Sequence, residues 1–284
     1  MTVARQPGLR APVPLTAAHA NEGLRGLTIK DVNKTFSVTR TSTLSALSGI
    51  NMAIAPGSVV AVLGPSGCGK TTLLEIVCGL QLPDAGGKIE LGGLDVTGRR
   101  GHFAYMPQRD ALLPWRTALD NAVLGLELKG IVRKEARSQA QELFRIFNLA
   151  EFTHYYPKQL SIGMRQRVAL LRTFLFPSTF MLLDEPFASL DAITRMNVHL
   201  WLLEMWERLE RTVMLVTHDI DEAIFLADRV IVLSTHPGAI VLDIEVPLRR
   251  PRTLEATTTE AFLGAKRRLL DALGQQVRAF LPTD

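Results

Sequence analysis

The apolar run Ser58-Val-Val-Ala-Val-Leu63 leads directly into Gly64-Pro-Ser-Gly-Cys-Gly-Lys-Thr-Thr72, and this stretch decides the fold of the chain. Its spacing of Gly, four residues, Gly, Lys and Thr matches the P-loop, whose glycines let backbone N–H groups surround phosphate oxygens. The apolar run predicts a buried strand, and residues 72–78 predict a helix whose positive dipole end faces the same phosphates. We therefore predict a nucleotide site in which Lys70 contacts the β and γ phosphates and Thr71 holds Mg²⁺.

The bulk composition is that of an ordinary globular protein. The 284 residues carry a net charge of +4, and 47% are hydrophobic and 21% charged. Two cysteines, Cys68 and Cys78, argue against a disulfide framework and fit a reducing compartment. No apolar run approaches the roughly 20 residues that cross a bilayer, so a membrane role should depend on a partner. Because no basic groove is interleaved with aromatic residues, nucleic acid is not expected as a partner.

Basic residues gather near the C-terminus. A solvated surface is the simpler interpretation, and contact with an anionic membrane face or partner is the alternative. The residues concerned are Arg249, Arg250, Arg252, Lys266, Arg267, Arg268 and Arg278. Residues 1–25 lack the hydrophobic segment of a signal peptide and are predicted to form a flexible tail.

Strand and helix patterns alternate along most of the chain. The predicted strands are residues 27–32, 50–54, 59–63, 88–91, 103–106, 180–183, 213–216 and 230–233. Besides residues 72–78, the predicted helices are residues 117–129, 133–147, 163–174, 192–210, 220–226 and 257–280. This order predicts an α/β fold: a P-loop NTPase (RecA-like) core with a largely parallel sheet, a β-rich N-terminal subdomain, and an inserted α-helical subdomain over residues 109–172.

Polar side chains follow three of the predicted strands. Asp184 and Glu185 come directly after an apolar strand, where Asp184 is placed to hold Mg²⁺ and Glu185 to orient or deprotonate a water. His218 follows another strand and can reach the γ phosphate, and Gln108 follows a third and can offer its amide to Mg²⁺ or water. Because parallel strands end at one edge of a sheet, these side chains should meet over one crevice.

A second anion-binding helix start is predicted at Ser161 and Gly163. Ser161 is a suitable N-cap, and Gly163 leaves backbone N–H groups accessible. The chain has one P-loop, so we interpret the second phosphate site as serving the nucleotide of a neighbouring subunit.

In this order, the motifs resemble those of the ATPase subunits of ABC transporters, over residues 26–245. Residues 246–284 then form an extension with a helical pattern. The resemblance implies that ATP and Mg²⁺ are the cofactors and gives each motif a role. The implied residues are Gly64, Pro65, Ser66, Gly67, Cys68, Gly69, Lys70, Thr71 and Thr72 for the Walker A loop, Gln108 for the Q-loop, Ser161 and Gly163 for the signature, Asp184 and Glu185 for Walker B, Asp191 for the D-loop, His218 for the switch histidine, and Phe36 for stacking on adenine.

Two further segments are similar to the importer group for nitrate, sulfonate and taurine, whose relatives carry pyrimidine precursors. They are Leu112-Leu-Pro-Trp-Arg-Thr-Ala-Leu-Asp-Asn121 and Met164-Arg-Gln-Arg-Val-Ala-Leu170. The resemblance implies a head-to-tail homodimer on the cytoplasmic face of the inner membrane, beneath two integral-membrane permease subunits and served by a solute-binding protein. Residues 108–115 would border the groove for a permease helix. The solute, expected to be small and anionic or heterocyclic, does not touch this subunit.

Three other functions remain open at this stage. An exporter ATPase shares the fold. A soluble ABC-type ATPase acting on nucleic acid or ribosomes usually carries long coiled coils or two cassettes, which this chain lacks. A P-loop kinase of a small metabolite would not need Ser161 or His218.

One residue departs from the pattern of the family. Ile162 stands where the resemblance leads us to expect the first glycine of the signature. Because β-branched residues strongly disfavour positive φ, we expect Ile162 to make closure of the site less easy without preventing it.

Overall fold

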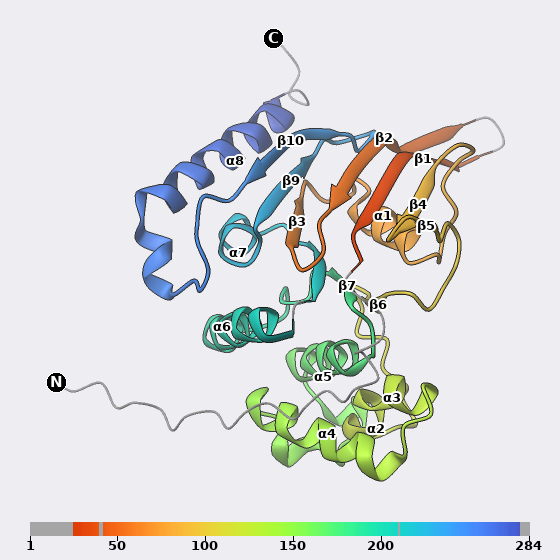
Figure 1. Ribbon diagram of the computed structural model, residues 1–284, viewed down its shortest axis with the longest axis vertical. Helices are drawn as coiled ribbons and strands as arrows, with labels where there is room; N and C mark the ends of the chain where they lie inside the picture. Colours follow the sequence, from red (N-terminus) through yellow and green to blue (C-terminus); the bar gives the residue numbers. More distant parts are fainter. Residues whose placement is uncertain (1–24, 40–41, 210, 279–284) are drawn as a thin grey trace. The chain divides into compact units, whose positions relative to one another are not determined.

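The computed structural model describes residues 25–39, 42–209 and 211–278 (Figure 1). Residues 112–177 form one compact unit, and the described residues before and after them form a second. The predicted insertion, residues 109–172, differs from the first unit by a few residues at each end. The predicted tail, residues 1–25, lies almost entirely outside the described residues.

A six-stranded sheet forms the centre of the second unit. Every residue of β3, β7 and β8 is buried, which is the pattern of parallel strands covered on both faces. Five strands run parallel and β10 pairs antiparallel to β9. In spatial order the strands are β10 (Ile240–Glu245), β9 (Arg229–Leu233), β3 (Val59–Leu63), β8 (Thr212–Val216), β7 (Phe180–Asp184) and β6 (Ala104–Met106). The predicted parallel core is present, and β10 was not predicted.

A smaller antiparallel sheet makes up the β-rich N-terminal part of the same unit. Its order is β2 (Thr43–Ile54), β1 (Leu27–Ser37), β4 (Lys88–Leu91) and β5 (Leu94–Asp95). The sequence predicted only the apolar portions of β1 and β2. The C-terminal end of β1 and the N-terminal end of β2 are also strand. They lack a continuous apolar pattern but pair through backbone groups, as Phe36 does with Leu44. One hydrophobic cluster joins both sheets around α1 (Lys70–Val77).

Three further α-helices belong to the second unit. They are α6 (Ala192–Leu209), α7 (Ile220–Leu226) and α8 (Glu260–Arg278), with the 3-10 helix η4 (Leu254–Thr258) before α8. Helix α8 packs on α7 and on strands β9 and β10, as Figure 1 shows. The predicted helix over residues 257–280 is therefore a 3-10 turn followed by an α-helix, and residues 279–280 lie outside the described part.

The unit of residues 112–177 is helical. It contains α2 (Ala118–Ala122), α3 (Leu124–Leu128), α4 (Arg133–Ile146), η2 (Ala150–Phe152), η3 (Pro157–Gln159) and α5 (Ile162–Leu175). The prediction of one helix over residues 117–129 was wrong: it breaks at Val123, whose ψ of 0° departs from helical geometry. No described helix is both long and apolar enough to pass through a membrane.

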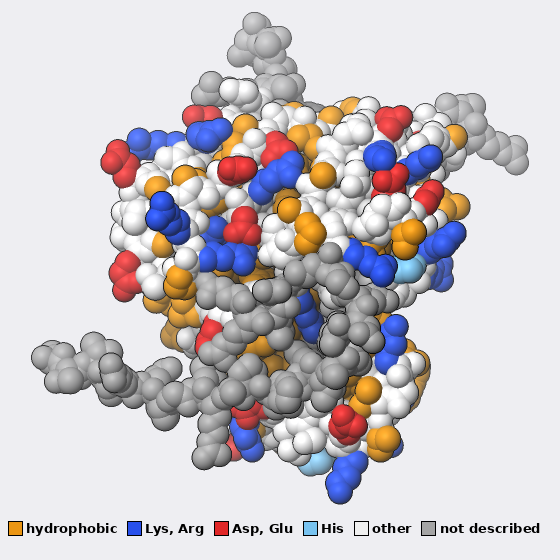
Figure 2. Space-filling model, in the orientation of Figure 1, with side chains coloured by type: hydrophobic (Ala, Val, Ile, Leu, Met, Phe, Trp, Pro, Cys, Tyr) orange, Lys and Arg blue, Asp and Glu red, His pale blue; other side chains and the backbone are white. Residues whose placement is uncertain are grey.

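The basic residues near the C-terminus do not all lie in solvent. On the face in Figure 2, acidic and basic side chains are interspersed over the unit that holds the sheets. Arg250 pairs with Asp228 at 2.7 Å, and Lys266 pairs with Asp221. Arg252 is buried, with 4% of its surface exposed. For Arg252 the interpretation as a solvated charge was therefore wrong, because backbone carbonyls and Asp228 replace water around the guanidinium.

We expect Arg252→Ala to lower the free energy of unfolding by about 2–4 kcal/mol. The Arg252 guanidinium donates to the carbonyls of Phe225 and Leu248 and approaches Asp228 at 3.5 Å, so truncation leaves buried acceptors unpaired. Urea unfolding measures the change. Arg249→Ala, which removes an exposed arginine nearby, is the control and should be nearly neutral. Equal effects of the two substitutions would contradict a structural role for Arg252.

Candidate nucleotide site

The P-loop lies between β3 and α1 in a conformation that requires glycine. Gly67 and Gly69 have φ angles of 80° and 98°, in the left-handed region. A Cβ on Gly69 would stand 2.7 Å from the carbonyl oxygen of Ala46, and one on Gly64 would stand 2.6 Å from Cys68 Sγ. The loop is therefore too tightly packed for side chains at these two glycines. Its remaining members, Pro65 and Ser66, lie in the same turn, and Thr72 lies on α1.

Lys70 is buried at the start of α1, with 6% of its surface exposed. Its Nζ donates to the carbonyls of Gly64 at 2.7 Å and Pro65 at 2.8 Å. Cys68 Sγ lies 3.9 Å away, at the limit of a weak contact. An ammonium has three donors, so Lys70 is held across the loop with donor capacity left for an oxygen in the cradle. Burial raises the pKa of the Cys68 thiol, which makes it a poor nucleophile.

Asp184 ends β7 with two unsatisfied carboxylate oxygens. The residue is 1% exposed, and neither oxygen accepts a hydrogen bond from the described residues. Burial, with the neighbouring Glu185 charge, raises the pKa of Asp184 to about 6, although the Thr71 hydroxyl and Lys70 favour the ionised form. A buried carboxylate with free oxygens fits a divalent cation, which would replace the lost solvation. Mg²⁺ characteristically uses one or two carboxylates together with phosphate oxygens.

Three side chains meet at the ends of β6, β7 and β8. Glu185 Oε2 lies 3.2 Å from Gln108 Nε2, which donates to it, and 3.5 Å from His218 Nδ1. Glu185 has a φ of 47°, unusual for a residue with a side chain, and its N–H donates to the Val216 carbonyl at 2.9 Å. The structure thus brings together the strand-end residues that sequence reasoning selected. The strained backbone aims the Glu185 carboxylate across the sheet edge.

The sequence analysis missed the support beneath His218. Asp219 caps α7 by accepting the Glu222 N–H at 3.1 Å, and its other oxygen lies 3.7 Å from Arg195. This pair links α6 to the segment that carries His218. An Asp before a helix is a visible cap signal, but the partner on α6 is remote in sequence and only the fold places it.

Each of the remaining predicted residues makes a contact within its own unit. Phe36 is half-buried on β1, with Lys34 Nζ 5.4 Å from the centre of its ring. Asp191 Oδ1 accepts the Thr194 N–H at 2.9 Å, at the start of α6. Ser161 caps α5 by accepting the Met164 N–H at 3.3 Å, within the helical unit. Their roles toward a nucleotide stay predictions.

The backbone at Ile162 does not have the positive φ that a β-branched residue disfavours. Ile162 is the first residue of α5, and it is not among the described residues with positive φ. Its side chain is exposed, with 64% of its surface in solvent. The expectation that a β-branched residue strains this position was wrong, because the helix begins here with ordinary φ and the following Gly163 is already inside it.

We expect Ile162→Gly to change ATP turnover less than about threefold, because no strained φ is relieved. Steady-state ATPase assays of the purified chain measure this. Ile162→Ala removes the side chain without freeing the backbone and is the matched control. A rise of several orders of magnitude in the glycine variant alone would show that Ile162 disables the natural site.

Comparison with known proteins agrees with this geometry. Residues 47–188 match the family model described as ABC transporter. A formylaminopyrimidine import ATP-binding protein of Halalkalibacterium halodurans is 40% identical over 231 residues, which cover 81% of this chain and 88% of that protein. This chain belongs to the ABC transporter family. A taurine import ATP-binding protein of Chromobacterium violaceum is 43% identical over 205 residues, covering 72% of this chain and 78% of the relative.

Two further comparisons extend the ABC transporter assignment. The nitrate import ATP-binding protein of a Synechocystis strain is 39% identical over 222 residues, covering 78% of this chain and 83% of that protein. A solved dimer of a bacterial ABC transporter cassette has a TM-score of 0.72 and 30% identity, and it covers 78% of this chain and all of its own. The three import ATP-binding proteins fall in the importer group that the sequence motifs indicated.

Proposed function

We propose that this chain is the ATP-hydrolysing subunit of an ABC importer for a small anionic or heterocyclic solute. The convergence of Gln108, Glu185 and His218 at one sheet edge carries the proposal, because it assembles water-orienting groups on the face that also holds Asp184. The relatives named above are import ATP-binding proteins for formylaminopyrimidine, taurine and nitrate, which favours import over export.

The residues around the P-loop would bind and orient ATP. The loop from Gly64 to Thr72 offers backbone N–H groups and the Lys70 ammonium to the phosphates, and Phe36 offers a ring to the adenine. Thr71, Asp184 and Gln108 would hold Mg²⁺. That cation neutralises phosphate charge when it is bound.

Hydrolysis then requires a positioned water. Glu185 accepts a proton from it or fixes its direction toward the γ phosphate, and Gln108 holds the Glu185 carboxylate at 3.2 Å. His218 Nδ1 lies 3.5 Å from the same carboxylate, and this contact keeps the His218 imidazole beside the reacting groups. Catalysis here consists mostly of positioning and charge neutralisation.

We infer a head-to-tail pair of chains with two composite sites. Ser161 and Gly163 of a second copy would close over the phosphates, since the α5 N-terminus offers N–H groups and a positive dipole end. Asp191 would lie along the same interface. A likeness to a dimeric cassette bound to ADP and phosphate, with a TM-score of 0.70, supports a pair of chains that binds nucleotide.

The pair would work at the cytoplasmic face of the inner membrane as a peripheral assembly. Two integral-membrane permease subunits and a solute-binding protein complete the transporter in this proposal. We assign no nucleic-acid partner.

Reconstitution tests the direction of transport. The chain and the permease encoded beside it are reconstituted in vesicles with the ATPase subunit on the outside. ATP turnover is then compared between vesicles that contain, and vesicles that lack, the solute-binding protein encoded by a neighbouring gene. Import predicts that the solute-loaded binding protein stimulates turnover several-fold over the empty protein. Solute pumped away from the ATPase side, without any need for a binding protein, would show an exporter instead.

A further inference from the structure

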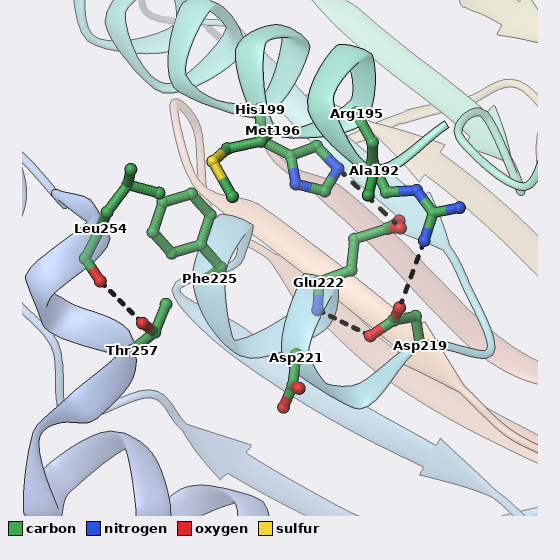
Figure 3. A pocket seen from close by; sticks show the side chains of 10 residues that line it. All are labelled: Ala192, Arg195, Met196, His199, Asp219, Asp221, Glu222, Phe225, Leu254 and Thr257. Carbon is green, nitrogen blue, oxygen red and sulfur yellow. Dashed lines mark hydrogen bonds and ion pairs between the residues drawn. The ribbon is translucent and has the colours of Figure 1, made fainter. Parts of the chain in front are cut away.

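A cavity of about 210 Å³ lies in the second unit, between α6, α7 and η4 (Figure 3). Its apolar wall includes Met196, Phe225 and Leu254, and Met196 and Leu254 have 45% and 40% of their surfaces exposed. None of its lining residues belongs to the P-loop. A hollow with an apolar rim and a few polar groups inside is the usual form of a small-molecule site.

Two buried polar side chains at the cavity each have an atom without a hydrogen-bond partner among the described residues. The side chains of His199 and Glu222 are 10% and 6% exposed. His199 Nε2 and Glu222 Oε2 are 3.9 Å apart, too far for a hydrogen bond, and their heads face each other in Figure 3. Among the described residues, neither His199 Nε2 nor Glu222 Oε1 has a hydrogen-bond partner. Buried polar atoms are rarely left unpaired, so these two atoms favour a polar ligand in the cavity.

Burial favours the neutral form of both groups. Burial, reinforced by the charge of Asp219, raises the pKa of Glu222 to about 8, and burial lowers the pKa of His199 to about 4. A neutral carboxyl offers one O–H donor and a carbonyl acceptor, and a neutral imidazole offers one donor and one acceptor. The charged residues that line the cavity have counter-charges: Arg195 lies 3.7 Å from Asp219, although its Nε has no hydrogen-bond partner among the described residues, and Asp221 pairs with Lys266.

We propose that this cavity binds a small, uncharged, planar molecule whose edge carries adjacent N–H donor and acceptor groups, such as a cyclic amide or an aminoheterocycle. The polar edge pairs with Glu222 and His199, and the ring lies against Met196 and Phe225. A donor and acceptor side by side complement a neutral carboxyl with two hydrogen bonds. A fixed charge would find no free counter-charge here and would lose its hydration.

The cavity shares a wall with the hydrolysis site. Arg195, Asp219 and Glu222 also line a smaller cavity of about 40 Å³ that contains Glu185 and His218. A molecule bound to Glu222 would therefore lie beside Arg195 and Asp219, which support the segment that carries His218. The proposal does not rest on the function proposed above, because binding is measured without ATP hydrolysis.

Ligand-detected NMR with 2-aminopyrimidine as the probe tests the site on the full chain. Excess ADP is present throughout, so that the nucleotide site is filled. We expect saturable binding with a Kd on the order of 1 mM, as suits a probe of this size. Leu254→Trp should weaken binding at least tenfold, because the larger side chain occupies part of the cavity. Leu254 is exposed, so the substitution should leave the fold intact. Leu263→Trp, an equally exposed leucine outside the cavity, is the matched control and should bind as the parent does.

Glu222→Leu and Glu222→Gln separate hydrogen bonding from shape. The glutamine variant keeps one donor and one acceptor and should retain binding within a few-fold, whereas the leucine variant should lose it; melting curves confirm that both are folded. Absence of saturable binding up to about 20 mM in the presence of excess ADP would overturn the proposal, and so would unchanged binding to Leu254→Trp. A cavity that holds only a bridging water gives the first of these results.

Discussion

Glu185→Gln abolishes ATP hydrolysis and leaves ATP binding intact: this is the largest effect we expect of any single substitution. The amide keeps the size of the carboxylate and its contacts with Gln108 and His218, but it cannot accept a proton from water. Loss of a general base costs about 10²- to 10⁴-fold in turnover. Phosphate release measures hydrolysis, and equilibrium binding of a fluorescent ATP analogue measures affinity.

The control for this substitution is Glu90→Gln. It makes the same chemical change in an exposed ion pair with Lys30. Glu90 lies on β4 of the smaller sheet and not at the ends of β6, β7 and β8. Turnover of the Glu90 variant should equal that of the parent. Near-normal hydrolysis in the Glu185 variant would show that another group takes the proton, and the strained φ of Glu185 would then need a different explanation.

The nucleotide site could be predicted from the sequence because each of its parts is local. The P-loop is one continuous segment, and Asp184, Glu185 and His218 directly follow apolar strands whose parallel pairing brings their ends together. A rule about sheet edges was sufficient to predict that Gln108 and Glu185, 77 residues apart, would meet over one crevice, and the structure places their side chains 3.2 Å apart.

Other features depend on tertiary packing and had no local signal. Glu222 has the appearance of an ordinary first-turn acid of a helix, and only the fold shows that it is buried against His199. Burial of Arg252 likewise depends on how the C-terminal extension crosses α7. For Ile162 a rule about glycine conformations was applied where the helix had already begun, so the backbone strain on which that expectation rested is absent.

The composite site yields the second large effect, which is seen in mixed pairs of chains. Lys70→Ala removes the phosphate-binding ammonium, and Ser161→Asp keeps an N-cap for α5 but places a negative charge where a phosphate should bind. Each homodimer should lose about 10²-fold or more in turnover, because each lacks a group that stabilises charge on the phosphates. Ser161→Asn, an uncharged N-cap of similar size, should lose much less.

Co-expression with two affinity tags isolates pairs that contain one chain of each kind. If the P-loop of one chain meets the signature of the other, a Lys70→Ala chain paired with a Ser161→Asp chain has one complete site and regains turnover well above either homodimer. A native chain paired with the double variant has none, since each site then contains one defective half. Sites built within single chains would give the reverse result: the native chain in the second pair would stay active and the first pair would be dead. The two pairs contain the same substitutions in equal amounts, so stability and expression cannot explain a difference between them.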